Sequence, residues 1–247
     1  MTGARGWTSD RTGDDTAAVD LLDGLATTRA IRRYTDRPVT DEELRMILWA
    51  ATRAPSGSNR QPFRFVVLRD GPGAVEARRI LGDAARRMWT GKRATDRYTA
   101  GSGAVGRSPK ARMAATMDHY SAHMADAPVI VLACLVRYRE ANPFEGSSVY
   151  PACQNLLLAA RAVGLGGVLT QLQLAASGEL ATVLGLPDHV AVHATITLGE
   201  PAGHHGPVRR RPLGELVYED RWGGPAPWAL DPPGTRFTRA GPPPPAG

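Results

Sequence analysis

The stretch VYPACQNLLLAARAVGLGGVLT (residues 149–170) predicts a buried helix followed directly by a strand. Residues 149–163 are apolar almost all round, and a helix with that pattern is buried in a core or at a subunit interface. Gly164 suits the position just after the helix, where the backbone often turns left-handed. Residues 166–170 (GGVLT) then predict a short strand.

Helices and strands alternate irregularly on either side of this stretch. Thr40 and Glu43 match a capping box, which starts one helix, and Pro55 ends that helix. Residues 128–136 (PVIVLACLV) are continuously apolar, as in a strand covered on both faces. The remaining expected elements are helices at residues 17–28, 72–97, 110–125 and 176–184 and strands at residues 63–68 and 190–198. This order predicts an α+β domain in which helices cover a sheet.

The two ends of the chain differ from its middle in composition. Residues 1–18 are polar and predict an N-terminal tail, while residues 223–247 are rich in proline and glycine and predict a C-terminal tail or arm. Trp228 and Phe237 lie in the second segment, which either docks on a partner subunit or stays mobile. We therefore expect a single domain at residues 19–222, which suits a chain of 247 residues.

The charge of the chain comes almost wholly from arginine. There are 30 Lys+Arg against 24 Asp+Glu, a net charge of +6, and 28 of the basic residues are arginines. They occur in short groups, and no run reaches five like charges, as a basic tail that coats nucleic acid would. No zinc-finger spacing, basic zipper or RNA-binding aromatic signature occurs either. We expect no nucleic-acid partner and assign most arginines to the solvated surface.

Neither a membrane segment nor a disulfide framework is predicted. The longest apolar run, residues 127–136, is too short to cross a bilayer, which needs roughly 20 residues. The first residues contain no apolar segment of a secretory signal. Cys134 and Cys153 form no disulfide or metal-binding pattern, which fits a reducing cytosol. We therefore expect a cytoplasmic location and no membrane partner.

Two loops have compositions suited to ligand binding. TTRAIRRY (residues 27–34) carries three arginines within five positions, and guanidinium groups bind phosphate oxygens in bidentate fashion. APSGSNRQP (residues 54–62) is a small polar loop that can bring backbone N–H groups and short side chains against a flat polar ligand. Taken singly, each loop is equally consistent with an ordinary solvated connection.

Several familiar catalytic signatures are missing. The chain has no GxGxxG after a strand, no GxxxxGK[ST] phosphate loop, no GxSxG nucleophile elbow and no HExxH zinc motif. His119 and His123 have i,i+4 spacing on a helix, but no carboxylate or cysteine nearby completes a site. His204 and His205 are expected to be a solvated surface pair. We therefore expect no metal.

In their order, the motifs resemble the FMN-dependent nitroreductase family. TTRAIRRYTDRPV followed by APSGSNRQPFRFVVL is similar to the opening of that family, and APVIVLACL is similar to its central strand. YPACQNLLLAARAVGLGGVLT resembles its central helix and flavin-facing strand, and VRRRPL resembles its C-terminal element. The resemblance covers residues 19–222. It implies a mixed, mostly antiparallel sheet flanked by helices, in an intertwined homodimer with FMN at the interface.

The resemblance also implies which residues bind FMN, while the chemistry takes place at the flavin N5. In the first element these are Arg29, Ala30 and Arg32, with Arg32 near the flavin N1 and O2. Thr28 stands where the family has arginine and Ala30 where it has serine, so one hydroxyl contact is lost. The partner's loop would supply Pro55, Ser56, Gly57, Asn59 and Gln61, the flavin-facing strand Leu169, Thr170 and Gln171, and the C-terminal element Arg209 and Arg210.

The implied activity is that of an oxidoreductase. A hydride from NADPH or NADH would reach FMN, and a small aromatic acceptor (a nitroaromatic, a quinone or a flavin) would then be reduced in the same place, giving ping-pong kinetics. Residues 97–125 would cover the site, with Tyr98, Met113, Met117 and Tyr120 either lining a pocket or forming an amphipathic cover helix. The alternatives are another chemistry on the same fold (flavin cleavage, dehalogenation or dehydrogenation) and a non-catalytic flavin-binding protein.

Overall fold

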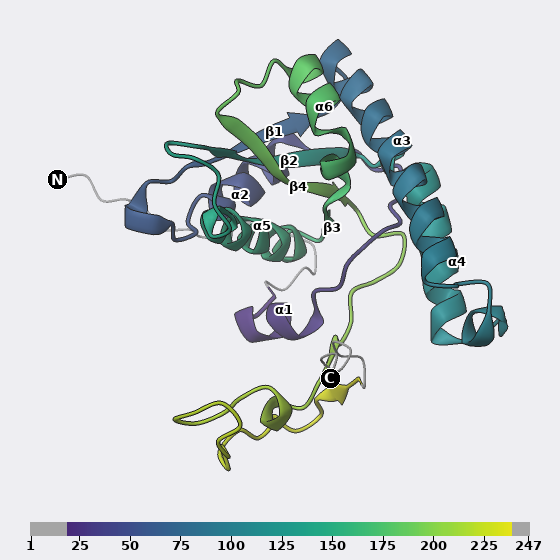
Figure 1. Cartoon of the computed structure of the whole chain (residues 1–247), viewed down its shortest axis with the longest axis vertical. Coiled ribbons are helices and arrows are strands. Elements are labelled where there is room, and N and C mark those ends of the chain that lie inside the picture. Colours follow the sequence, from purple (N-terminus) through teal and green to yellow (C-terminus); the bar gives the residue numbers. More distant parts are fainter. Residues whose placement is uncertain (1–18, 239–247) are drawn as a thin grey trace, which may run out of the picture.

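The computed structural model describes residues 19–238 of the chain, in the arrangement shown in Figure 1. The N-terminal tail expected at residues 1–18 and the last nine residues lie outside the described part. The helices are α1 (Leu21–Thr27), α2 (Asp41–Ala51), α3 (Pro72–Thr95), α4 (Pro109–His123), α5 (Tyr150–Ala162) and α6 (Ser177–Leu184). The strands are β1 (Phe63–Leu68), β2 (Val129–Val136), β3 (Gly166–Thr170), β4 (Val190–Gly199), β5 (Arg209–Arg210) and β6 (Arg236–Phe237).

Four strands form the central sheet in the order β1-β2-β4-β3, and each neighbouring pair is antiparallel. β2 lies inside this sheet and is buried along almost its whole length, as its unbroken apolar sequence predicts. β1 and β3 are the two outer strands. The small parallel pair of β5 and β6 is separate from this sheet. The order of the strands therefore places the loop before β1 and the strand β3 at opposite edges.

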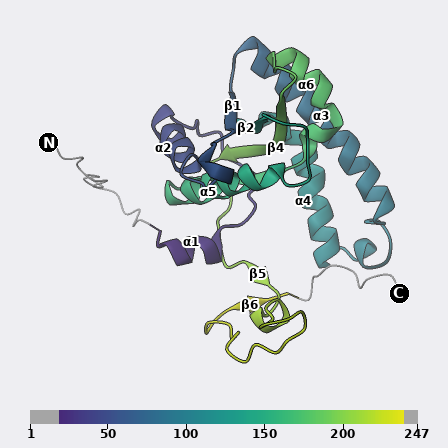
Figure 2. The same ribbon diagram turned by 60° about the vertical axis from the view of Figure 1, so that its left-hand side comes forward.

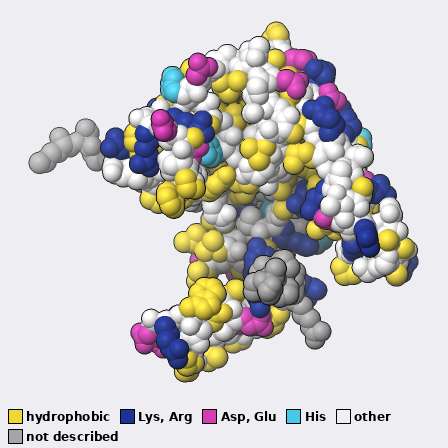
Figure 3. All heavy atoms as spheres, in the orientation of Figure 1, with side chains coloured by type: hydrophobic (Ala, Val, Ile, Leu, Met, Phe, Trp, Pro, Cys, Tyr) yellow, Lys and Arg dark blue, Asp and Glu magenta, His cyan; other side chains and the backbone are white. Residues whose placement is uncertain are grey.

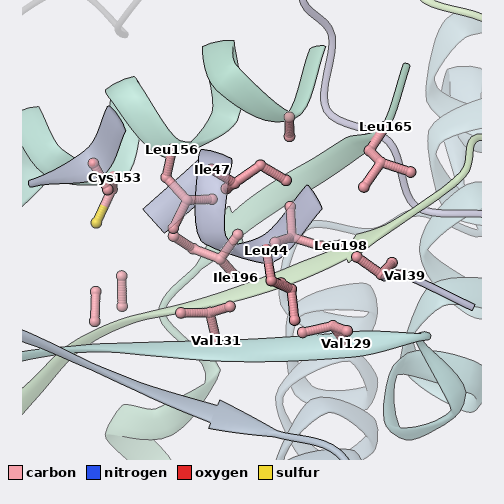
Figure 4. Close-up of a cluster of buried hydrophobic side chains, with 14 of the residues drawn as sticks. Val39, Leu44, Ile47, Val129, Val131, Cys153, Leu156, Leu165, Ile196 and Leu198 are labelled. Atoms are coloured by element: carbon pink, nitrogen blue, oxygen red, sulfur yellow. The ribbon is translucent and has the colours of Figure 1, made fainter. Parts of the chain in front are cut away.

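Helices cover both faces of the sheet (Figure 2). On one face, Leu44 and Ile47 of α2 and Leu156 of α5 meet strand residues such as Val131 and Ile196 in the apolar cluster of Figure 4. On the other face, α3, α4 and α6 bury a second cluster that includes Leu81, Tyr120 and Leu180. This arrangement confirms the α+β architecture that the sequence predicts.

The observed helix ends follow local capping chemistry. Thr40 and Glu43 form the expected capping box at the start of α2, with hydrogen bonds in both directions. Gly164 has a φ of +81°, the left-handed conformation expected just after α5. α1 begins later than predicted, because the Asp20 side chain accepts hydrogen bonds from Leu22 N–H and Asp23 N–H and acts as its N-cap.

Helix α5 buries only part of its apolar surface within one chain. Ala152, Cys153, Leu156 and Ala160 are buried against the sheet and α2. Its other apolar residues, including Leu157, Leu158 and Ala159, are only half-buried. Leu157 and Ala159 pack against the edge of the same core and Leu158 lies beside α1, so one chain covers the outer side of α5 only in part, as burial at a subunit interface would require.

A segment near the N-terminus packs closely against β3. The Ile31 N–H donates to Gly167 O at 3.0 Å. A Cβ on Gly166 would lie 2.5 Å from Ile31 Cγ1, and a Cβ on Gly167 would overlap the carbonyl oxygen of Thr197 in β4. Both positions therefore need glycine: Gly166 leaves room for Ile31 and so for residues 28–34 along the edge of the sheet, and Gly167 leaves room for the backbone of β4.

The chain after β4 leaves the main body. Gly206 N–H donates to Thr27 O and Val208 N–H to Ala26 O, so this segment first runs beside the end of α1. It then forms the separate part with β5 and β6 that Figures 1 and 2 show away from the sheet. Trp222 and Leu230 in this part are 88% and 76% exposed. Within residues 19–238, no helix is both long and apolar enough to cross a bilayer.

We predict that Gly167→Ala destabilises the protein by ~1–3 kcal/mol, because the added methyl group has no room beside the β4 backbone. Urea unfolding followed by circular dichroism measures the change. Gly178→Ala in α6 is the matched control, since its Cβ would meet nothing within 4 Å and alanine favours a helix. Equal stability of the two variants would contradict the close approach.

Candidate functional site

The first candidate element lies along the outer edge of β3. Ile31 is buried and hydrogen-bonded to Gly167, while its neighbours Arg29 and Ala30 are exposed and Arg32 is half-buried. Tyr34 forms an isolated bridge with Pro201 just after β4. The structure therefore brings two of the expected groups together, namely the arginine-rich segment and the strand that ends at Thr170.

His205 fixes the segment from the opposite side. The Arg29 N–H donates to His205 Nδ1 at 3.3 Å, and His205 Nε2 lies 3.1 Å from Leu165 O. Since Nδ1 accepts, Nε2 carries the proton and donates to Leu165. Burial is the main cause that lowers the pKa of His205, and the nearby Arg161 and Arg29 lower it further. The imidazole is therefore neutral at pH 7 and acts as a structural bridge.

Donor groups in this segment lack partners within the described part of the chain. The Thr28 hydroxyl and the Arg32 Nε are buried without a hydrogen bond, and Arg161 Nε is in the same condition. Among residues 19–238, Arg29 and Arg33 form no ion pair with a carboxylate. Figure 3 shows basic side chains gathered in the hollow beside α4. Unpartnered donors and unpaired cations together favour an anionic ligand that accepts hydrogen bonds.

A buried tyrosine network lies under Arg32. The Tyr34 hydroxyl is 2.8 Å from Ile31 O and 2.7 Å from the Thr197 hydroxyl, which is also 3.1 Å from the Tyr120 hydroxyl. The Arg32 guanidinium lies 6.0 Å from the centre of the Tyr120 ring. Burial raises the pKa of Tyr120 to about 12 and also raises that of Tyr34, so both remain protonated donors at neutral pH.

The third group follows β3. Leu169, Thr170 and Gln171 are all half-buried, and Thr170 Oγ1 donates to Thr195 O at 3.1 Å. The Gln171 amide donates to the Tyr150 hydroxyl at 3.2 Å. These residues therefore form the continuation of the same edge that carries Arg29 and Arg32.

Arg209 and Arg210 belong to the segment after β4, which passes close to Arg29 before it reaches β5. The Arg29 guanidinium is 3.9 Å from where a Cβ on Gly206 would lie, and Arg209 follows three residues later. Arg209 and Arg210 are exposed on β5, and Arg210 Nη1 donates to the Arg209 carbonyl at 2.9 Å. The structure leaves both guanidinium groups without a carboxylate partner in the described residues.

The second expected loop does not join this group within one chain. Pro55, Gly57, Asn59 and Gln61 are exposed beside the start of β1, and Ser56 Oγ accepts from Gln61 N–H at 2.9 Å. β1 and β3 are separated by three strand spacings, roughly 14 Å across the sheet. One chain therefore presents half of the predicted site at each edge.

Several residues of this region have contacts that differ from those their local sequence predicts. The expectation of a solvated pair holds for His204, which is exposed, but is wrong for His205. Tyr120 is 2% exposed and belongs to the core. At this position the structure therefore favours the amphipathic cover helix over a pocket lining. Thr28 and Arg161 carry orphaned donors. His205 and Arg161 gave no local signal, because only the fold brings them to residues 28–32.

No metal centre emerges from the described residues. Within residues 19–238 there is no group of three or more His, Cys, Asp or Glu side chains that could hold a metal ion. The rings of His119 and His123 lie 4.6 Å apart, and His123 Nδ1 lies 3.2 Å from Asp126 Oδ2. Cys134 and Cys153 are buried free thiols, and burial raises the pKa of each. Neither thiol is therefore a nucleophile at neutral pH.

Comparison with known proteins identifies the class. The model of the nitroreductase family matches residues 25–200, and the chain belongs to that family. A Thermus thermophilus protein named NADH dehydrogenase is 32% identical over 206 residues, which cover 76% of this chain and 90% of the relative. The fold is likewise the nitroreductase fold, and the chain is an oxidoreductase.

Two further proteins add to the comparison. A Desulfovibrio desulfuricans protein solved in complex with FMN has a TM-score of 0.59 and 32% identity, and the match covers 85% of this chain and 99% of that one. The NADPH-flavin oxidoreductase of Vibrio harveyi is 25% identical over 203 residues, which cover 82% of this chain and 75% of the relative.

We predict that His205 makes stability depend on pH. Because folding lowers its pKa below 6.5, the unfolded chain binds the extra proton first, and stability present above pH 6.5 is lost as the pH falls. His205→Gln removes this titration, so its free energy of unfolding should fall less than that of the wild type between pH 7 and pH 5. Urea unfolding at both pH values measures the difference, with His204→Gln as the control. Parallel losses in wild type and His205→Gln would refute a neutral, bridging His205.

Proposed function

We propose that this chain is an FMN-dependent oxidoreductase that takes a hydride from NADPH or NADH and reduces a small aromatic acceptor in ping-pong fashion. Membership of the nitroreductase family supports the redox class. The FMN complex of the Desulfovibrio relative and the name of the Vibrio relative support the cofactor and the hydride donor. The acceptors in view are a nitroaromatic, a quinone and a flavin.

The residues at the edge of β3 fit FMN. The phosphate requires cations and hydrogen-bond donors: Arg29 supplies a guanidinium group at this edge, and Arg209 and Arg210 would supply two more from β5, all without carboxylate partners in the described residues. The isoalloxazine ring requires donors at its N1 and O2 edge, where the orphaned Arg32 Nε and Thr28 hydroxyl are available. The unpartnered donors are the observation that carries the proposal.

Each group has a distinct role in this scheme. FMN, when bound, supplies the hydride-accepting and hydride-donating chemistry. Arg32 places a fixed positive charge beside the flavin, which favours negative charge in the reduced state. The Tyr120 ring lies 6.0 Å from the Arg32 guanidinium, and the Thr197 hydroxyl, 3.1 Å from that of Tyr120, fixes the ring in place. Thr170 and Gln171, both half-buried at this edge, would line the ring.

A second copy of the chain would complete the site. The loop with Pro55, Ser56, Gly57, Asn59 and Gln61 lies at the other edge of the sheet, so we propose that it covers the flavin of a partner subunit. An exposed apolar surface on the α2 and α5 face suits such a homodimer: Leu21 and Leu22 of α1 are 67% and 73% exposed, and Trp49 of α2 is exposed nearby. Figure 3 shows apolar side chains gathered over α1.

The C-terminal part would strengthen the same dimer. We treat residues 19–222 as the domain and residues after 222 as an arm. Trp228 and Phe237 of the arm are exposed in the single chain, so docking on the partner would bury them. Helix α4 would cover the bound acceptor on its solvent side. Met113 of this helix is exposed and could contact the acceptor.

We predict that Arg29→Ala and Arg210→Ala each weaken FMN binding by ~1.5–3 kcal/mol, because each removes a charge-assisted hydrogen bond to phosphate. Fluorescence titration of FMN into the apoprotein gives the affinity. Arg87→Ala, an exposed arginine of α3, is the control and should bind FMN as the wild type does.

Two outcomes bear on the proposal as a whole. Unchanged FMN affinity in both arginine variants would show that the phosphate lies elsewhere. A protein that binds FMN but is reduced by neither NADPH nor NADH under anaerobic conditions would contradict the oxidoreductase and favour flavin cleavage, dehydrogenation or a purely binding role.

A further inference from the structure

A groove lies beside the loop that we propose covers the partner's flavin. Its walls come from Gly57 and Pro62 on one side and from residues 135–148 on the other. The Gly57 N–H donates to Ser148 Oγ at 3.3 Å, which ties the two sides together. Tyr138 and Phe144, which line the groove, are 56% and 75% exposed. An aromatic groove thus begins at the flavin-covering loop.

Two guanidinium groups lie against the exposed tyrosine of this groove. Arg60 lies 4.6 Å and Arg139 lies 5.4 Å from the centre of the Tyr138 ring. Neither arginine has a carboxylate within ion-pair distance among residues 19–238, and both are exposed. Each is therefore held near one ring by a cation–π contact and keeps its N–H groups free for a ligand.

The carboxylate inside the groove is already neutralised. Glu145 is bound by Arg137, with Nη2 to Oε1 at 2.6 Å and Nε to Oε2 at 3.0 Å. The Arg137 guanidinium holds the pKa of Glu145 below its usual range, so this pair stays formed at neutral pH. At the rim, Arg60 and Arg139 carry positive charge and the exposed carboxylate of Glu140 lies beside Arg139, so the rim keeps a net positive charge.

We infer that this groove binds the adenosine end of NADPH, with Arg60 and Arg139 holding its 2′-phosphate. Adenine would stack on Phe144, because the guanidinium groups of Arg60 and Arg139 already lie over the Tyr138 ring, and a phosphate dianion suits these two unpaired guanidinium groups. The inference rests on the proposed function, because the groove starts at the loop assigned to the flavin and an extended dinucleotide has one end at each place. It assigns NADPH, and not NADH, as the preferred hydride donor.

Steady-state kinetics of the FMN-loaded protein test the assignment. The wild type should show a lower KM for NADPH than for NADH. In Arg60→Ala/Arg139→Ala, the KM for NADPH should rise about tenfold or more while the KM for NADH changes less than about twofold and kcat stays the same. 2′,5′-ADP should inhibit the wild type competitively against NADPH and lose that effect in the double variant.

Two controls separate phosphate recognition from other effects. Arg139→Lys keeps the charge and should retain most of the preference for NADPH. Arg87→Ala removes an exposed arginine on α3 and should leave both KM values unchanged.

Three results would overturn the inference. The first is a wild type that uses NADH at least as well as NADPH, and the second is a double variant in which both KM values rise together or neither changes. If NADPH still reduces the flavin, either of these two results overturns the inference but leaves the proposed function intact. The third, reduction by neither nucleotide, removes the proposed function together with the inference.

Discussion

The approach of Ile31 to Gly166 and Gly167 is the contact on which the candidate site depends. It needs a glycine at position 166, since a Cβ there would lie 2.5 Å from Ile31 Cγ1, while Gly167, whose Cβ would overlap Thr197 O, lets β3 lie close to β4. Because Ile31 is hydrogen-bonded to Gly167 O, Arg29 and Arg32 take fixed positions at the edge of the sheet. A side chain at Gly166 would displace Ile31 and, with it, the segment that carries Arg29 and Arg32.

The order of the strands imposes the second constraint. With β1 and β3 at opposite edges, one chain presents cationic donors at one side and the polar loop with Gly57 at the other. A flat ligand that needs both would therefore be bound by two copies, as we propose. The half-buried face of α5, with the exposed apolar residues of α1 and Trp49 of α2, offers the surface through which two copies would pack.

Local signals in the sequence predict most of the fold, but they do not predict the long-range contacts that support the candidate site. The box of Thr40 and Glu43, the left-handed Gly164 and the apolar run of β2 each act within a few residues, and all are confirmed. His205 contacts Arg29 across 176 positions, and Tyr120 meets Thr197 across 77. No local pattern marks such pairs, because packing of the whole chain creates them.

Division of the site between two copies is the central claim, and hybrid dimers test it most directly. One chain carries Arg29→Ala and Arg32→Ala, and a differently tagged chain carries Gly57→Phe, which adds bulk to the loop proposed to cover the partner's flavin; among the described residues a Cβ there meets Ser148 Oγ alone, at 3.8 Å, so the chain itself has room for it. Each variant alone should fail to retain FMN. Co-expressed hybrids should retain about one FMN per two chains, since one of their two sites has both halves intact. Hybrids without FMN would contradict the account.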